Sequence, residues 1–184
     1  MLVLDAGDYS MGTAFGAATR ETGCELQLMS RMGYDATTFG NHDFDFGPAG
    51  LGKSIDVAAK ADRFPPVVAS NTNFAGTDPT LTDLQRLAKD GVIRRHLVID
   101  RGGMRFGIFG VLGKEAQFYT TGAGAVTFSD ANETAKEMAT TLREREKADV
   151  VICLSHGGVE KGRMGALPRA TMCAWPKSRR VSTL

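Results

Sequence analysis

Several features that would assign a protein class directly are scarce or absent in this sequence. Its three cysteines, Cys24, Cys153 and Cys173, are widely spaced and odd in number, which excludes a disulfide framework and a Cys-x-x-Cys metal site. The formal net charge of +1 gives no electrostatic reason to expect a nucleic acid or an anionic membrane as partner. No apolar run reaches the roughly 18 residues that span a bilayer, and the N-terminus shows no secretory pattern.

What remains is the composition of an ordinary folded domain. The hydrophobic fraction is 42% and the charged fraction 23%, and 184 residues are enough to bury a core without covalent staples. We expect Cys24 and Cys153 to pack in or near that core. The opening MLVLDAGD is typical of a buried strand already in progress, so we expect the domain to begin upstream of Met1.

Apolar, β-branched runs alternate with helix-forming segments along the chain. The predicted strands are 2–7, 34–40, 65–74 and 149–158, and the predicted helices are 12–33, 47–62 and 129–148. Two β-rich runs within 92–113 flank Arg101-Gly102-Gly103, which predicts an antiparallel hairpin. Ser129 or Asp130 is expected to cap the last helix, with Glu133 completing a capping box. This order predicts an α/β layered domain with a mixed sheet.

Polar side chains follow three of the predicted strands. These are Asp8, the pair Asn41 and His42, and the pair Ser155 and His156. Because ligands bind outside the carboxyl ends of the strands in such sheets, we expect these residues to meet in one place. Asp, Asn and His suit a divalent ion such as Mn²⁺, Zn²⁺ or Mg²⁺, and a carboxylate such as Asp8 can bridge two ions.

His42 and Asp45 are three positions apart, close enough for the carboxylate to accept the imidazole N–H and raise the pKa of the ring. A protonated His42 beside a metal site could stabilise a phosphoryl transition state or protonate the leaving oxygen. Each residue taken alone also has a structural interpretation: Asp8 as a turn or helix cap, and a histidine as packing. We assign His96, inside a β-rich run, to the structural class.

Five segments carry a wider pattern: DAGD, GYDATTFGNHDFDFG, VVASNTNF, FGIFGVLGKEA and VVICLSHGG. In order and spacing they resemble the 5′-nucleotidase branch of the calcineurin-like metallophosphoesterases, over about residues 2–162. GNHDFD is the most specific part. The resemblance implies a layered mixed-sheet fold, a β-sandwich flanked by helices, that is incomplete in this chain.

The resemblance also implies a role for each matched residue. Asp8 matches the aspartate that bridges two metals, and Asn41 and His156 match ligands of the second metal. His42 and Asp45 match the catalytic pair near the phosphate. The implied reaction is hydrolysis of a nucleoside 5′-monophosphate or related phosphoester by a metal-activated water, as in nucleotide catabolism.

Other family elements are missing from the sequence. The family's Asp-x-His and Gly-His-x-His motifs do not occur, and no histidine follows His156. The separate nucleotide-binding domain is absent too, so this chain retains ligands mainly for one of the two metals. Asp43 stands where the family often has Glu or Asp, and we expect it to be structural.

The last segment, 163–184, breaks the α/β rhythm and resembles no part of the family domain. Reading the codons of ATMCAWPK (170–177) from their third base permits Asp-Asp-Val-Arg-Leu-Ala-Lys, which looks like the family's next helix. We therefore expect a partial catalytic domain at 1–162 followed by a tail that is out of frame; a short protein with an unusual basic tail is the alternative.

The sequence is compatible with three functions. The first is a metal-dependent phosphoester hydrolase of the 5′-nucleotidase type, weak or inactive in this form. The second is a non-catalytic module that binds a metal or a partner, and the third is an unstable translated remnant. The family is often exported to the periplasm, cell wall or exterior, whereas the sequence itself leaves localisation, substrate and metal open.

Overall fold

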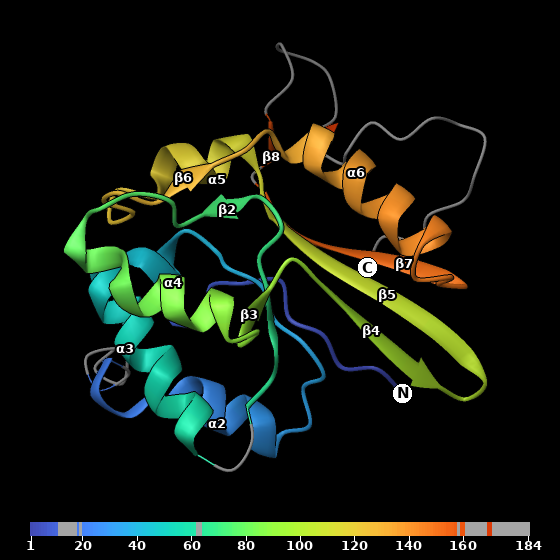
Figure 1. Cartoon of the computed structure of the whole chain (residues 1–184), viewed down its shortest axis with the longest axis horizontal. Helices are drawn as coiled ribbons and strands as arrows, with labels where there is room; N and C mark the ends of the chain where they lie inside the picture. The colour runs from blue at the N-terminus through green and yellow to red at the C-terminus, as the bar shows by residue number, and fades with distance from the viewer. Residues whose placement is uncertain (11–17, 19, 62–63, 158, 161–168, 171–184) are drawn as a thin grey trace.

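The computed structural model describes residues 1–10, 18, 20–61, 64–157, 159–160 and 169–170, and it has the mixed α/β organisation that the sequence predicts (Figure 1). The named helices are α2 (Cys24–Arg31), η1 (His42–Phe44), α3 (Gly47–Lys60), η2 (Pro79–Leu81), α4 (Thr82–Lys89), α5 (Lys114–Tyr119) and α6 (Ala131–Glu144). The strands are β1 (Val67–Val68), β2 (Thr72–Asn73), β3 (Ile93–Arg94), β4 (His96–Arg101), β5 (Met104–Leu112), β6 (Thr127–Phe128), β7 (Val150–His156), β8 (Val159–Glu160) and β9 (Arg169–Ala170). None of the helices in these ranges has the length and apolar character needed to cross a membrane.

The longest strands form one mixed sheet in the order β4-β5-β7. β4 runs antiparallel to β5, and β5 runs parallel to β7 with Leu112 opposite His156. The turn between β4 and β5 places Gly102 and Gly103 at φ 62° and 76°. Positive φ at both central residues is what a tight hairpin turn requires, so the predicted hairpin is confirmed.

A second layer is built from short parallel pairings. Leu4 bridges Ala36, Thr37 bridges Val67, and β1 pairs with β3. The predicted strands 2–7 and 34–40 are therefore reduced to single bridges. One reason is that side chains replace ladder bonds here, since the Val3 N–H is bound by a carboxylate oxygen of Asp35 at 2.9 Å.

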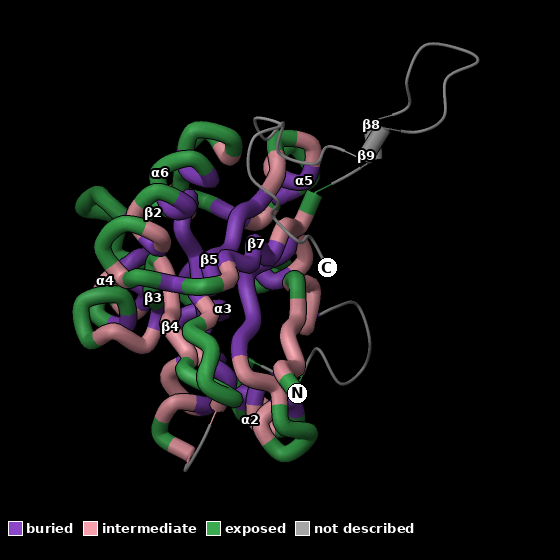
Figure 2. Tube along the Cα trace, turned by 90° about the vertical axis from the view of Figure 1, so that its right-hand side faces the viewer, coloured by how far each residue is buried: buried purple, intermediate pink, exposed green. Residues whose placement is uncertain are grey.

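The two strand layers enclose one apolar cluster and carry another on each outer side. Successive residues of β5 and β7 point to opposite faces, so each strand contributes to two clusters. The inner cluster contains Ala36, Val68, Ile108, Ile152 and Leu154. In Figure 2 the tube of β5 and β7 is buried over much of its length in the middle of the molecule.

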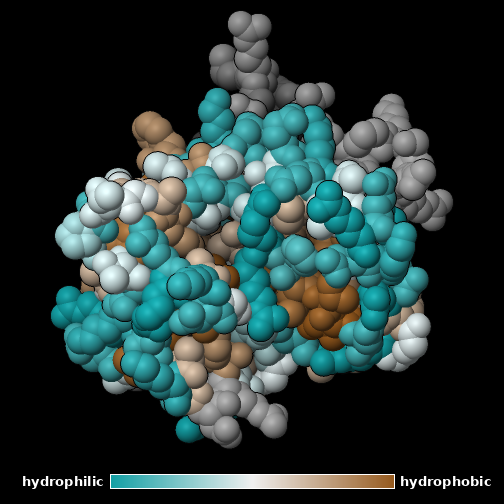
Figure 3. Space-filling view, viewed as in Figure 1, coloured by the Kyte–Doolittle hydropathy of each residue, from teal (hydrophilic) through white to brown (hydrophobic). Residues whose placement is uncertain are grey.

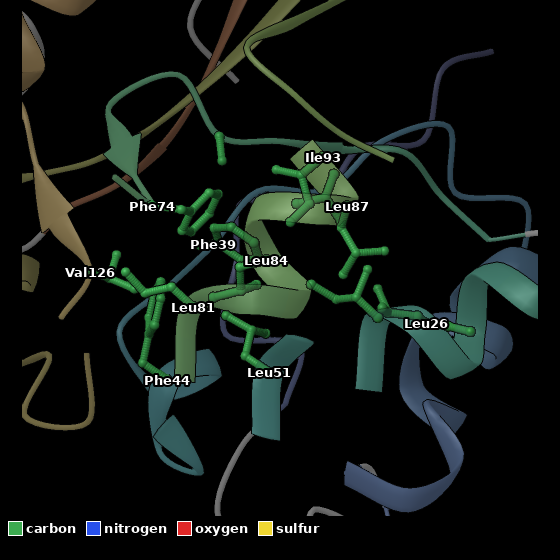
Figure 4. Packing of buried hydrophobic residues seen from close by; sticks show 14 of the residues in the cluster. Leu26, Phe39, Phe44, Leu51, Phe74, Leu81, Leu84, Leu87, Ile93 and Val126 are labelled. Carbon is green, nitrogen blue, oxygen red and sulfur yellow. The ribbon is translucent and has the colours of Figure 1, made fainter. Parts of the chain in front are cut away.

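Helices α2, α3 and α4 cover the outer side of the short-strand layer. Figure 4 shows side chains from these helices converging with Phe39, Phe44 and Phe74. Phe44 packs edge-on to Phe39 with the ring centroids 5.4 Å apart. Complete burial of one such large side chain contributes about 1.5–3 kcal/mol, so this cluster anchors the loop that follows Phe39.

Helix α6 covers the outer face of β5 and β7. Its buried residues Ala135, Met138, Ala139 and Leu142 recur at helical spacing. The side chain of Asp130 caps the helix by accepting the N–H of Glu133 at 2.9 Å. Of the two predicted caps, Ser129 and Asp130, the structure therefore has Asp130. Figure 3 shows that α6 leaves an apolar area uncovered on the neighbouring face of β4 and β5.

Other predicted elements differ from the structure. Gly23 adopts a left-handed φ of 57° and interrupts the predicted helix 12–33, of which 12–17 and 19 lie outside the described residues. The predicted strand 65–74 splits into β1 and β2, because the chain turns at Ser70 towards β5. Of the predicted tail 163–184, only β9 lies within the described residues, where it pairs antiparallel with β8, so the boundary at 162 stays a prediction.

Candidate metal and phosphate site

Three of the predicted site residues meet at the ends of their chain segments. Nε2 of His156, at the end of β7, lies 3.2 Å from Oδ1 of Asn41 and 3.3 Å from Oδ2 of Asp8. Asn41 directly precedes η1, and Asp8 follows the first segment of the short-strand layer. The side chains of His156 and Asp8 remain about one-fifth exposed, at 20% and 21%, so solvent reaches the point where they meet.

The contact of His156 with Ala6 assigns a proton to Nδ1. Nδ1 lies 2.8 Å from the backbone oxygen of Ala6, which can only accept, so Nδ1 donates. In the neutral ring Nε2 then presents a lone pair to Oδ1 of Asn41 and Oδ2 of Asp8. In the neutral ring these three atoms are all acceptors, so a cation among them would be favourable. In the imidazolium the Nε2 proton takes that place and is donated to the two oxygens.

These distances also fit a divalent ion. Ligands bound at about 2.0–2.2 Å in a tetrahedral arrangement are about 3.3–3.6 Å apart, close to the contacts that Nε2 of His156 makes. Within the described ranges there is no group of three or more His, Cys, Asp or Glu arranged to hold a metal. The convergence depends on an asparagine, whose amide oxygen adds a ligand without adding charge.

His42 and Asp45 form the contact that their spacing predicts. Nδ1 of His42 lies 2.9 Å from Oδ2 of Asp45, and both side chains are 43% exposed. The hydrogen bond to Asp45 raises the pKa of His42, its desolvation lowers it, and the charges of Asp45 and Asp8 add to the rise. The backbone N–H of His42 also donates to Oδ1 of Asp8 at 2.9 Å, which joins this pair to the acceptor cluster.

Asp43 holds the two loops of the site together, in line with its expected structural role. Its side chain is buried and accepts three backbone N–H groups, from Asp8 at 3.0 Å, Ser10 at 3.0 Å and Gly40 at 2.7 Å. Burial raises the pKa of Asp43 to about 8, while the three N–H donors favour the ionised form and oppose that rise. The charge of Asp8 acts in the same direction as burial.

The backbone of Asp8 is held in a conformation that side chains seldom adopt. Its φ is 63°, in the left-handed region. A Cβ on Gly40 would lie 2.1 Å from Oδ1 of Asp8, so only glycine allows this approach. The N–H bond to Asp43 and the bond from His42 therefore fix Asp8 on both its backbone and its side chain.

The remaining histidine and serine named from the sequence are His96 and Ser155. His96, on β4, lies 3.5 Å from the carboxylate of Glu146, as a structural residue would. Ser155 precedes His156 on β7 and is half-buried. Cys153 is buried and Cys24 is partly buried, as expected.

Sequence reasoning missed several residues that shape the site. Asp5 accepts the N–H of Gly7 at 2.9 Å and the hydroxyl of Thr37 at 2.6 Å, which ties the Asp8 loop to the next segment. The Tyr9 hydroxyl is buried with no hydrogen-bond partner in the described part of the chain, and burial, followed by the charge of Asp43, raises its pKa. The available signal for Asp5 was a carboxylate within an otherwise apolar run, directly after Leu2, Val3 and Leu4.

Comparison with known proteins supports the resemblance stated above. No family model matches the chain. The trifunctional nucleotide phosphoesterase protein YfkN of Bacillus subtilis is 30% identical over 177 residues, covering 85% of this chain and 12% of that protein. The 5′-nucleotidase of Rattus norvegicus is 30% identical over 165 residues, covering 89% of this chain and 26% of the rat protein.

Solved structures give the same result. The 5′-nucleotidase precursor from Thermus thermophilus superposes with a TM-score of 0.67 at 30% identity, covering 86% of this chain and 28% of the other. The calcineurin-like phosphoesterase YfkN structure superposes at 0.58 with 23% identity, a likeness of fold alone. The chain thus spans about an eighth to a half of the proteins named here. In sequence and in fold it belongs to the 5′-nucleotidase family of calcineurin-like phosphoesterases, and it spans part of the length of those members.

Proposed function

We propose that the chain carries part of a metal-dependent phosphoester hydrolase site of the 5′-nucleotidase type, with nucleotides as the substrate class. Asp8, Asn41 and His156 would hold one divalent cation, Mn²⁺, Zn²⁺ or Mg²⁺. The observation that carries the proposal is the approach of two acceptor oxygens to within 3.2 and 3.3 Å of Nε2 of His156, whose Nδ1 is committed to Ala6.

The chain's own residues would prepare this site in three ways. The Ala6 carbonyl orients the His156 ring and leaves the Nε2 lone pair of the neutral ring for a cation. Asn41 contributes oxygen without charge, so a bound cation keeps more of its positive charge towards phosphate. When bound, the cation would supply Lewis-acid polarisation of a phosphoryl oxygen.

The pair of His42 and Asp45 would face the phosphate. Asp45 orients the ring through Nδ1 and favours its protonated form, which leaves Nε2 as the donor towards substrate. A positive, half-exposed ring whose loop is bonded to Asp8 is suited to an anionic group beside the cation.

The proposal extends to the fold. The short-strand layer and the β4-β5-β7 sheet, with helices on both outer sides, correspond to the β-sandwich flanked by helices that the family resemblance implies. The three apolar clusters support this interpretation, because one lies between the layers and one lies under the helices on each side.

Titration of the 184-residue chain with Mn²⁺ tests the cation site directly. We expect one Mn²⁺ site, measured by calorimetry and by the loss of the free-ion electron paramagnetic resonance signal. Asn41→Ala should abolish this binding. The matched control is Asn73→Ala, because the Asn73 amide is exposed and donates to the Ser129 hydroxyl instead. Equal Mn²⁺ affinity in Asn41→Ala and wild type would refute the site.

The number of Mn²⁺ sites, together with an assay of AMP turnover, separates catalysis from metal binding alone. A non-catalytic metal-binding module is the second candidate, because the sequence retains family ligands mainly for one metal. We expect little or no turnover of AMP with Mn²⁺ or Zn²⁺, together with one weak site. Two tight sites and turnover comparable to a full-length relative would favour the enzyme, and loss of that turnover in His42→Ala would locate it here.

A further inference from the structure

Strand β5 continues beyond the end of its neighbour β4. The last β4 pair is His96 opposite Phe109, whereas β5 runs on to Leu112. The backbone of Gly110 is then satisfied by Ser70, whose N–H donates to the Gly110 oxygen at 2.8 Å and whose hydroxyl accepts the Gly110 N–H at 3.1 Å. The loop after β1 therefore takes over the pairing that β4 leaves unfinished.

Asn71 completes this substitution with its side chain. The residue is fully buried, and Nδ2 donates to the Leu112 oxygen at 2.9 Å while Oδ1 accepts the Leu112 N–H at 3.0 Å. One amide thus binds both backbone groups of Leu112, as a neighbouring strand would. Nδ2 also donates to the Ser129 oxygen at 3.1 Å, and Gln117 donates to the Leu112 oxygen at 2.7 Å.

The end of β5 fixes the backbone of His156. Leu112 lies opposite His156 in the sheet, and the next residue, Gly113, donates its N–H to the His156 oxygen at 2.7 Å. Leu112 and Gly113 present their N–H groups to opposite sides of the strand, one to Asn71 and one to β7. A shift of Leu112 would therefore move Gly113 and, with it, the backbone of His156 that carries the imidazole.

We infer that Asn71 is a positioning residue for the cation site, acting through Leu112 and Gly113 on His156. This inference rests on the proposed function for the presence of a metal. The hydrogen bonds from Asn71 to Leu112 and from Gly113 to His156 do not depend on that function. The amide is required because it offers a donor and an acceptor together; aspartate keeps the shape and the acceptor but loses both Nδ2 donations.

The test compares Asn71→Asp and the milder Asn71→Ser with two controls. Asn73→Asp makes the same change two residues away, at an exposed amide that bonds to the Ser129 hydroxyl. Leu87→Ala, in the cluster under α4, lowers stability far from β5. For each variant we would measure the Mn²⁺ dissociation constant, the hydrogen-exchange rate of the Gly113 N–H without metal, and the melting temperature.

We expect both Asn71 variants to exchange the Gly113 N–H faster and to bind Mn²⁺ about tenfold more weakly, the lower end of what supporting residues contribute. Asn73→Asp should change neither, and Leu87→Ala should lower the melting temperature without weakening Mn²⁺ binding. If Asn71→Asp does not fold, Asn71→Ser and Gln117→Met, which removes the second donor to Leu112, carry the comparison.

Three results would overturn the inference. One is unchanged Gly113 exchange in the folded Asn71 variants; another is faster exchange with Mn²⁺ affinity equal to that of wild type. The third is an affinity loss in Leu87→Ala as large as in Asn71→Ser. If wild type binds no Mn²⁺, the proposed function fails separately, and Gly113 exchange together with the His156 ring chemical shifts decides whether Asn71 positions the histidine.

Discussion

Replacing Asp43 with asparagine should destabilise the protein far more than its single-atom change suggests. Oδ2 of Asp43 accepts the N–H groups of Asp8 and Gly40, and Oδ1 accepts that of Ser10. Asparagine has one acceptor oxygen and an NH₂ group in place of the other. In either orientation of the amide, at least one buried backbone N–H then faces another donor.

The magnitude follows from these bonds. Because burial raises the pKa of Asp43 to about 8, the full effect is expected above that pH, where all three N–H groups bind an ionised carboxylate. A hydrogen bond to a charged acceptor contributes about 1.5–3 kcal/mol, and a buried donor left unsatisfied costs about 1–3 kcal/mol. Asparagine also removes a buried charge, which recovers part of the desolvation cost and keeps the net effect below the sum of these terms. We expect the free energy of unfolding to fall by about 2–4 kcal/mol, a large fraction of an ordinary domain's stability.

Urea unfolding above pH 8, followed by circular dichroism, measures this difference. The control is Asp45→Asn, two residues away, where the carboxylate is 43% exposed and contacts the His42 ring. An exposed contact of this kind contributes at most about 1 kcal/mol. A smaller loss of stability in Asp43→Asn than in Asp45→Asn would refute the assignment of Asp43 as the group that joins the two loops.

Three further changes have defined outcomes. Gly40→Ala would place Cβ 2.1 Å from Oδ1 of Asp8, so urea unfolding should show a loss of about 1–3 kcal/mol and Mn²⁺ should bind more weakly. Asp35→Asn removes the partner of Arg101, whose hydrogen bond holds the pKa of Asp35 below the unfolded value of 3.8. Because the pKa of Asp35 is lower in the folded than in the unfolded state, wild type should have the higher urea midpoint at pH values above 3.8. The difference in midpoint should disappear as the pH falls through the folded-state pKa. Asp130→Ala removes the cap of α6 and should lower unfolding free energy by about 1 kcal/mol, seen as a small fall in melting temperature.

Each of these outcomes has a result that contradicts it. Gly157→Ala is the control for Gly40, since the nearest heavy atom to its added Cβ is 3.7 Å away, and equal losses in the two variants would exclude crowding as the cause. A urea-midpoint difference for Asp35→Asn that stays constant from neutral to acid pH would show that its ionisation is not linked to folding. An unchanged melting temperature in Asp130→Ala would show that the cap does not stabilise α6.

Local sequence signals predicted the elements whose cause is local. Paired glycines determine the turn at Gly102 and Gly103, and Asp130 caps α6 through an N–H three residues ahead. The contact of His42 with Asp45 likewise follows from their spacing. In each case the partner lies within a few positions of the residue, so a short window of sequence contains the whole interaction.

Features that depend on distant partners were not predictable in this way. The role of Asn71 depends on where β4 ends, because only there do the backbone groups of Leu112 need another partner. The strand pattern of 2–7 gave no sign that a carboxylate from Asp35 would replace a ladder bond. The rule that ligands bind at the carboxyl ends of strands predicted that Asp8, Asn41 and His156 meet. The distances between these side chains could be known only from the structure.

The bond between the His156 ring and the Ala6 oxygen joins positions 150 residues apart. Closing so long a loop costs entropy that local pairing does not, and contacts of this kind slow folding. During synthesis Ala6 and Asp8 emerge long before the strand that ends at His156. Among the side-chain hydrogen bonds of the described residues this one spans the longest stretch of sequence, so cation binding would report on its completion. A Mn²⁺ signal during refolding would rise with that closure rather than with the formation of the helices.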